Sequence, residues 1–166
     1  FIKIIISIFI IAIFYSIPAN SNDKVAFIDI DFVINNSIIG KSTLKKIEEL
    51  NTRNIQILKK REKILKDLDS EIKKKQNVVS KEEFNKEVDI LKTKIKEFKI
   101  EKNEMVNEYN KIKNKELENL FKVINPIIKD YMNKNSIEIL LDRKNVFIGS
   151  SNSDLTKILI DEINKN

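Results

Sequence analysis

The sequence predicts an α+β protein in which a small β-sheet base carries a long antiparallel helical hairpin of coiled-coil character. Three observations predict this fold. Residues 41–125 contain no Gly and no Pro, in a chain of which 34% of the residues are charged, and such a stretch is typical of long exposed helix. Apolar residues within that stretch recur at heptad spacing. Short strand-like segments lie on both sides of it in the sequence.

The composition excludes several classes of chemistry. The chain has 166 residues, which suits one domain, and it contains no His and no Cys. Zinc sites, imidazole-based dyads, thiol nucleophiles and disulfides are therefore excluded. Gly40 and Gly149 are the only glycines, so no glycine-rich phosphate loop or dinucleotide fingerprint is present. We expect no enzyme, no metal, no cofactor and no small-molecule substrate.

Residues 1–21 have the pattern of a signal peptide. Lys3 precedes an uncharged run over residues 4–17, and the small residues that follow suit cleavage after Ser21. The alternative is an uncleaved membrane anchor, but the apolar run is shorter than the roughly 20 residues of a spanning helix. We therefore expect an exported protein.

The base is predicted from two separate segments, residues 22–40 and 126–166. Near its start, residues 24–30 alternate like a strand that is buried on both faces. Asp31 is then expected to cap a short helical stretch at residues 32–34.

The second segment of the base begins at Pro126 and first continues a helical face. Residues 137–141 have the pattern of a second strand. A turn and a third strand at residues 146–148 are expected to close a β-hairpin. Ser153 or Asn152 is expected to cap a final helix with one apolar face.

The arm is predicted over residues 41–125, with its tip near residues 76–80. Ser80 and Glu83 have the spacing of a capping box, which predicts that a new helix begins there and folds back on the first. Each helix carries an apolar seam, which is stronger in the second helix than in the first. The seam residues are Leu44, Leu58, Leu65, Ile72 and Val79 in the first helix, and Phe84, Val88, Leu91, Ile95, Phe98, Lys102, Met105, Tyr109 and Ile112 in the second.

The predicted base is too small to be stable alone, because three short strands bury little apolar surface. We therefore expect several copies of the base to associate through the strands. The residues expected to be buried by this association are Val25, Phe27, Ile28, Ile139, Leu141, Val146 and Ile148.

Positive charge is concentrated on the first helix of the arm. Residues 41–79 carry 12 Lys+Arg against 6 Asp+Glu, whereas residues 80–125 carry 11 against 10. Basic clusters attract acidic protein clients or anionic lipid surfaces, although a solvated helix face is the plain alternative. Exposed apolar side chains add contacts without sequence preference. The candidate client-binding residues are Lys59, Lys60, Arg61, Lys63, Lys66, Lys73, Lys74, Lys75, Ile55, Ile57, Ile64 and Val78.

Three motifs of the chain resemble a known family. They are K-V-A-F-I-D-I-D-F-V-I at the start of the mature chain, the Gly40-Lys41 pair that opens the arm, and L-D-R-K-N-V-F followed by D-L-T near the end. The sequence resembles the Skp/OmpH family of periplasmic chaperones of outer-membrane proteins, over essentially the whole mature chain.

This resemblance implies a homotrimer in which three bases form a β-barrel-like body and three arms surround a cavity. Unfolded outer-membrane proteins would be held there without ATP, and prevented from aggregating before membrane insertion. The resemblance also implies structural roles, as cap, turn and base-packing residues, rather than catalytic roles for five charged residues of the base. These are Asp29, Asp31, Asp142, Arg143 and Asp154.

Three other classes of protein are weighed against this one. An exported coiled-coil spacer or envelope-tethering protein explains the arm but not the strands at both ends of the chain. A nucleic-acid binder would need aromatic residues among the basic clusters, and export would separate it from most nucleic acid. An exported hydrolase would need a pair of carboxylates in a cleft, and the sequence indicates none.

Overall fold

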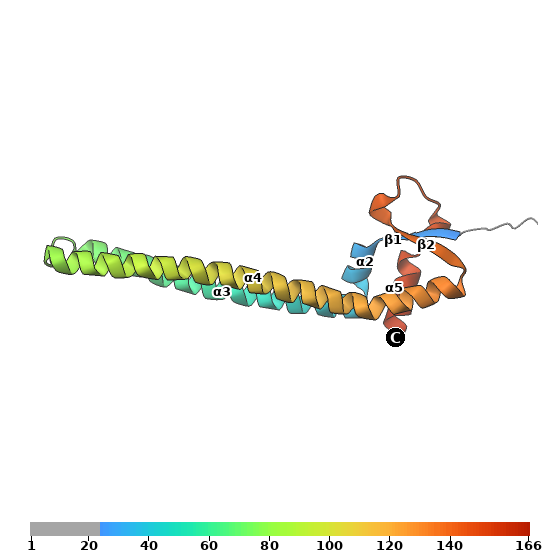
Figure 1. Ribbon diagram of the computed structural model, residues 1–166, viewed down its shortest axis with the longest axis horizontal. Helices are drawn as coiled ribbons and strands as arrows, with labels where there is room; N and C mark the ends of the chain where they lie inside the picture. Colours follow the sequence, from blue (N-terminus) through green and yellow to red (C-terminus); the bar gives the residue numbers. More distant parts are fainter. Residues whose placement is uncertain (1–23) are drawn as a thin grey trace, which may run out of the picture.

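The computed structural model describes residues 24–166, which form a small base and a long helical arm (Figure 1). The predicted signal peptide, residues 1–21, lies outside the described residues. The arm consists of α3 (Ile38–Lys75) and α4 (Lys81–Lys134), which lie side by side. The base contains β1 (Lys24–Ile28), α2 (Ile30–Asn36), β2 (Ile137–Asp142) and α5 (Thr156–Lys165), with 3-10 turns at Arg143–Asn145 (η1) and Ser151–Ser153 (η2).

The two strands form a parallel sheet across the base. Val25 lies opposite Ile139 and Phe27 lies opposite Leu141. Parallel strands need a crossover connection between them, because the chain must return to the same end of the sheet. Here α2 and the complete arm form that crossover, so the arm is an insertion between the two strands of one sheet (Figure 1).

The predicted third strand at residues 146–148 is wrong. After β2 the Asp142 carboxylate accepts a hydrogen bond from the Lys144 amide at 3.0 Å, and the chain enters η1. Val146 is half-buried, and the next two side chains are exposed to solvent, Phe147 to 97% and Ile148 to 84%. A three-residue apolar run forms a strand only beside a partner strand, and the sheet of the described residues has two strands.

The start of the base also differs from the prediction. The first strand ends at Ile28, and Asp29 rather than Asp31 caps the helix that follows. The Asp29 carboxylate accepts a hydrogen bond from the Phe32 amide at 2.9 Å, while Asp31 lies in the first turn of α2. Both aspartates suit a helix start, and only the point at which the strand leaves the sheet decides between them.

The predicted caps of the final helix are also wrong. Ser153 and Asn152 belong to η2, and α5 begins at Thr156. Leu155 is the N-cap residue of α5 and provides no side-chain cap, while the Asp154 carboxylate accepts a hydrogen bond from the Thr156 amide at 3.0 Å just before the helix.

A single core holds the base together. One face of the sheet packs against the last turns of α4, against α5 and against Val33 of α2. Apolar burial is the main favourable contribution to folding, so these contacts fix where the arm leaves the base. The buried core residues are Ala26, Ile28, Val33, Leu120, Ile124, Ile128, Leu155, Leu159, Ile160 and Ile163.

The seam of the arm is narrower than the sequence predicts. Ile72 and Leu91 are buried, and most of the other predicted seam residues are half-buried. Ile95 and Lys102 are exposed, although the spacing places them in the seam. A pair of helices covers only one stripe of each helix, so positions at the margin of that stripe remain in contact with solvent.

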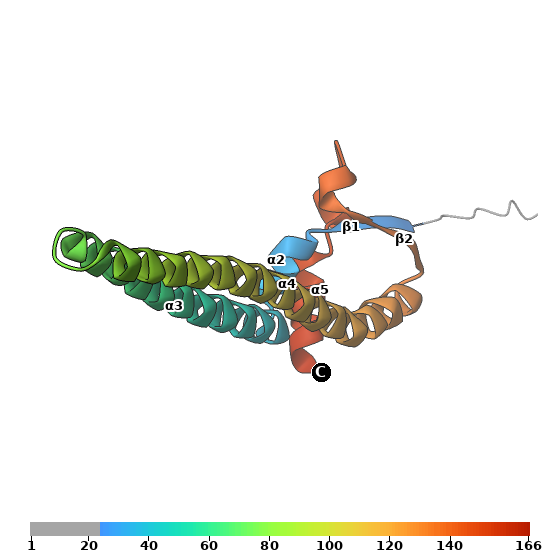
Figure 2. The same ribbon diagram turned by 60° about the vertical axis from the view of Figure 1, so that its left-hand side comes forward.

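The second arm helix is longer than the first because it continues into the base. It has 54 residues, whereas α3 has 38. The helix runs through Pro126 to Lys134. Proline removes one backbone hydrogen bond and bends a helix, and Figure 2 shows the orange end of α4 turning away from the line of the arm. The turn directs the chain toward β2.

The tip of the arm is capped as predicted. The Ser80 hydroxyl accepts a hydrogen bond from the Glu83 amide at 3.2 Å, at the first turn of α4. Glu82 and Glu83 lie in the same turn, where negative charge interacts favourably with the helix dipole.

Replacement of Ser80 with Ala should cost about 1 kcal/mol locally, because one helix amide loses its acceptor. We expect faster hydrogen exchange of the amides of residues 81–84. The matched control is Ser70→Ala, since the Ser70 hydroxyl bonds to the Lys66 carbonyl within α3 and caps no helix end. Equal exchange in the two variants would show that Ser80 does not cap the tip.

Gly40 is needed where α2 meets α3. A Cβ atom at this position would overlap the carbonyl oxygen of Ile34 and the hydroxyl of Ser37. Ser37 is itself buried and caps α3 by accepting a hydrogen bond from the Gly40 amide at 3.2 Å. The first turn of the arm is thus packed directly on the backbone of the base.

Replacement of Gly40 with Ala should lower the free energy of unfolding by about 1–3 kcal/mol, because the added methyl group overpacks this junction. Urea denaturation measures the change. Lys41→Ala is the control, because Lys41 is the next residue and is exposed. An unchanged unfolding midpoint for Gly40→Ala would contradict the close approach of the two helices.

Candidate functional site

The outer face of the sheet is apolar and exposed. Val25, Ile139 and Leu141 are 48%, 49% and 40% exposed, and they lie on the face opposite to the core. Phe147 and Ile148 extend the exposed apolar surface beside it. A small domain rarely leaves its sheet uncovered, and contiguous exposed apolar patches are typical of interaction sites.

The residues predicted to join copies of the base do not all lie on this face. Ile28 is buried in the core of the same chain. Phe27 is covered by the loop at Gly149, where the ring lies against the glycine backbone. Val146 is half-buried. The residues of the predicted set that are exposed are Val25, Ile139, Leu141 and Ile148.

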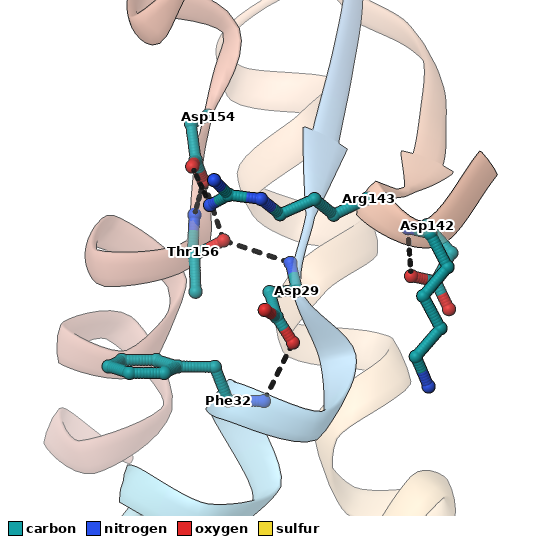
Figure 3. A network of polar contacts seen from close by, with 7 residues as sticks. Asp29, Phe32, Asp142, Arg143, Asp154 and Thr156 are labelled. Carbon is teal, nitrogen blue, oxygen red and sulfur yellow. Dashed lines mark hydrogen bonds and ion pairs between the residues drawn. The ribbon is translucent and has the colours of Figure 1, made fainter. Parts of the chain in front are cut away.

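A polar network joins the two ends of the chain in the base (Figure 3). The Thr156 hydroxyl accepts a hydrogen bond from the Asp29 amide at 2.9 Å and donates one to the Asp154 carboxylate at 2.5 Å. Arg143 forms an ion pair with Asp154 at 3.0 Å. The Asp154 carboxylate is thus occupied by neighbouring donors, which hold the turn after β2 against the start of α5.

A second ion pair ties the same turn to α2. The Lys144 ammonium lies 2.5 Å from the Asp31 carboxylate, and this hydrogen bond raises the pKa of Lys144. A pocket of about 330 Å³ lies beside the network, and its lining includes Phe32, Arg143 and Lys157. Within residues 24–166, no group of His, Cys, Asp and Glu side chains is arranged to hold a metal ion.

The network makes the base sensitive to acid. Burial raises the pKa of the Asp154 carboxyl, but the hydrogen bonds from Thr156 and the charge of Arg143 outweigh burial, and the pKa lies below its ordinary value. A carboxyl whose pKa is lowered by folding stabilises the folded state above its unfolded pKa of about 3.9. That stabilisation is lost as the pH falls through the lower pKa of the folded state.

Asp154→Asn should therefore lower the free energy of unfolding at pH 7 and flatten its decline between about pH 4 and pH 2. Denaturation midpoints measured across this range test the expectation. Asp130→Asn is the control, because the Asp130 pair with Lys134 is exposed and exposed pairs contribute little. Parallel pH curves for wild type and Asp154→Asn would show that the network does not stabilise the base.

The arm has two long sides that are separated by the seam. Arg61 pairs with Glu101 at 3.3 Å, and Lys75 pairs with Glu87 at 2.6 Å. Arg61 and Lys75 are 14 positions apart, and Glu87 and Glu101 are also 14 positions apart. Because 14 positions are two heptads, both ion pairs lie on the same side of the hairpin. We call this the paired side. Its helix rows are Ile57, Arg61, Ile64, Leu68, Glu71 and Lys75 on α3, and Glu87, Ile90, Lys94, Glu97, Glu101 and Glu104 on α4.

The opposite side of the hairpin is defined by the rows across the seam. On an α-helix, residues that lie three, four and seven positions apart share a face. Seam residues such as Leu58 and Leu91 therefore separate the paired side from a second set of rows, which we call the basic side. Its rows are Ile55, Lys59, Glu62, Lys66, Asp69 and Lys73 on α3, and Val88, Lys92, Ile95, Lys99, Lys102 and Val106 on α4.

The predicted client-binding residues do not form one patch. Some lie on the basic side, others lie on the paired side, and a third group faces away from α4 on the outer surface of α3. Val78 lies at the tip and is exposed. The residues on the basic side are Ile55, Lys59, Lys66 and Lys73, and those on the paired side are Ile57, Arg61, Ile64 and Lys75. Those on the outer surface of α3 are Lys60, Lys63 and Lys74.

The sequence analysis missed residues that α4 contributes to the basic side. Lys92, Lys99 and Lys102 carry positive charge there, and Ile95 is exposed beside them. These lysines were overlooked because the second helix as a whole has almost equal numbers of basic and acidic residues. A separate count for each heptad row would have found them, because the acidic residues of α4 occupy other rows.

The fold and its surfaces define a class: a protein with a long helical hairpin inserted into a small, incompletely covered sheet base. Residues 24–163 match the family model of the outer membrane protein (OmpH-like) family, and this chain belongs to that family. No curated protein matches the sequence.

A solved structure has the same fold. It is the crystal structure of a protein from Caulobacter crescentus CB15 that is assigned as an OmpH-like outer membrane chaperone. The match has a TM-score of 0.75 with 15% sequence identity, and it covers 85% of this chain and 83% of the other. At this identity the likeness shows the fold alone. Among the described residues, none of the helices combines the length and apolar character that crossing a membrane requires.

Proposed function

We propose that this chain is an ATP-independent holdase chaperone of the periplasm. In this proposal it binds unfolded outer-membrane proteins in a cavity between helical arms and prevents their aggregation before membrane insertion. Membership of the OmpH-like family supports the assignment, as does the fold shared with a protein assigned as an outer membrane chaperone. Holding an unfolded chain needs surface and enclosure, and it requires no catalytic group or cofactor.

The observation that carries the proposal is the uncovered base. The sheet has two strands, its outer face exposes three aliphatic side chains, and Phe147 stands beside it almost fully exposed. Association of three copies into a β-barrel-like body would cover this surface and pair the outer edge of β2, because an unpaired strand edge favours the addition of another strand. The outer edge of β1 already contacts the same chain, where the Phe27 carbonyl accepts a hydrogen bond from the Leu155 amide at 2.9 Å. Three arms projecting from such a body would surround a space without filling it.

The arm offers a client weak contacts of two kinds. Exposed aliphatic residues on both sides of the hairpin contribute apolar contact without sequence preference. Exposed lysines attract acidic segments over a screening length of about 8 Å at physiological salt. The same charges would allow contact with an anionic lipid surface. Loose contacts of this kind suit a client that has to be released without ATP.

The mass of the mature protein in solution tests this proposal directly. We expect three times the mass of one chain, and a gain of one client after addition of a urea-unfolded outer-membrane barrel. An elongated dimer that does not bind the client would instead support an exported coiled-coil spacer or envelope-tethering protein.

Ile139→Asp should dissociate the assembly, because a charge replaces an aliphatic side chain at the centre of the exposed sheet face. The side chain lies outside the core of the chain, so circular dichroism should show an unchanged helix content. The measurement is the mass in solution at a fixed protein concentration.

A matched deletion in the arm is the control for this variant. Removal of residues 58–64 together with residues 98–104 takes one heptad from each helix, and it removes Arg61 together with its partner Glu101. This shortened protein should still have three times the mass of its own, shorter chain. An assembly that survives Ile139→Asp and falls apart on the deletion would place the interface in the arms.

A further inference from the structure

The two sides of the arm are matched in exposed apolar residues and differ in charge. The basic side exposes Ile55, Ile95 and Val106, and the paired side exposes Ile57, Ile64 and Ile90. The rows of the basic side carry six lysines against two acidic residues, a net charge of +4. The rows of the paired side carry three basic residues against five acidic ones, a net charge of −2. Apolar contact alone therefore does not distinguish the sides, but charge does.

The charges on the paired side already have partners. Two ion pairs cross from α3 to α4 there, and the hydrogen bond to Glu87 raises the pKa of Lys75. A shallow groove of about 120 Å³ on this side has Leu65 and Phe98 in its lining, and the Arg61 pair with Glu101 lines it as well. Each charge that is neutralised in this way attracts an incoming chain less strongly.

The basic side keeps most of its charge available. Lys59, Lys66, Lys99 and Lys102 are exposed and form no ion pair with another residue in the described part of the chain. Lysine stems lie along apolar surface while the ammonium groups remain in water. Such lysines beside exposed aliphatic residues offer both apolar contact and charge to one bound segment.

The register of the hairpin brings the two helices' contributions together. Arg61 lies across from Glu101, so six positions back along α3 corresponds to six positions forward along α4. This places Ile55 across from residue 107, next to Val106, and Lys59 across from residue 103, next to Lys102. An apolar pair, Ile55 with Val106, therefore lies next to a basic pair, Lys59 with Lys102, along one surface.

We propose that the basic side of the arm is the surface that contacts the held client, and that it prefers unfolded segments in which acidic and apolar side chains are mixed. This inference rests on the proposed holdase function and identifies which part of the arm performs it. The complementary charge of such a segment raises the association rate on this side, whereas the negative paired side repels it.

The first test compares two variants that remove the same charge from different surfaces. Lys59→Gln, Lys66→Gln and Lys99→Gln together remove three positive charges from the basic side. The matched control combines Lys46→Gln, Arg53→Gln and Lys96→Gln, whose basic side chains are exposed on the outer faces of α3 and α4 and form no ion pair within the described residues. The full chain is used in both cases.

The client is a urea-unfolded outer-membrane barrel of net negative charge, diluted rapidly into each protein. At about 20 mM salt we expect the basic-side variant to associate about tenfold more slowly than wild type, and the control to change less than about twofold. At about 300 mM salt the three rates should converge, because screening shortens the reach of the charges. Equal slowing in the two variants would show that only net charge matters and would overturn the proposal.

A second test locates the contact without changing the charge. A photo-cross-linking amino acid in place of Ile55 reports on the basic side, and the same group in place of Ile57 reports on the paired side. These positions are 42% and 38% exposed in wild type, so accessibility alone favours neither strongly. We expect the client to be cross-linked mainly from position 55. Cross-linking mainly from position 57 would overturn the proposal and would place the client in the groove at Phe98.

The outcomes separate this inference from the function on which it rests. If wild type does not retain the client at all, the holdase proposal fails. If wild type retains it and the basic-side variant loses affinity only for vesicles of anionic lipid, the basic side is a lipid-binding surface and not a client-binding one.

Discussion

The parallel pairing of β1 with β2 constrains the whole molecule, because its two strands lie at opposite ends of the described chain. Val25 meets Ile139 only after the chain has run out along α3 and back along α4. The hairpin reduces the cost of that long closure, since its own packing brings the start of α3 and the end of α4 together. Leu120, Ile124 and Ile128 then cover the inner face of the sheet, so the arm and the base share one core.

Most residues of the long arm are exposed to solvent. Two helices in contact bury one stripe each, and the buried residues are few along most of the hairpin. Both flanks of the seam therefore face solvent, and the flanks differ because ion pairs between the helices gather on one of them. The position of each charge relative to the seam therefore differs between the flanks, which the total charge of either helix does not reveal.

The base has more apolar sheet surface than its helices and loops cover. The inner face of the sheet has α2, α4 and α5 against it, whereas on the outer face the Gly149 loop covers Phe27 but Val25, Ile139 and Leu141 remain exposed. The polar network around Asp154 and Thr156 holds the turn after β2 in place without covering that face (Figure 3). A single chain thus completes its core but leaves one face of its sheet exposed.

The sequence by itself determined the elements whose signals are local. The absence of Gly and Pro determined the long helices, the Ser80 and Glu83 spacing determined the tip, and the apolar pattern determined β1 and β2. Only the tertiary structure decided the rest, because those features depend on partners that are distant in the chain. The Val146 segment forms no strand, because the sheet of the described residues offers it no partner. Ile28 faces inward because its face of the sheet packs against α4 and α5. The register of α3 against α4 determines on which side of the seam each lysine lies. Spacing along one helix gives the relative directions of its side chains, but the position of the second helix decides which of those directions remain free to bind.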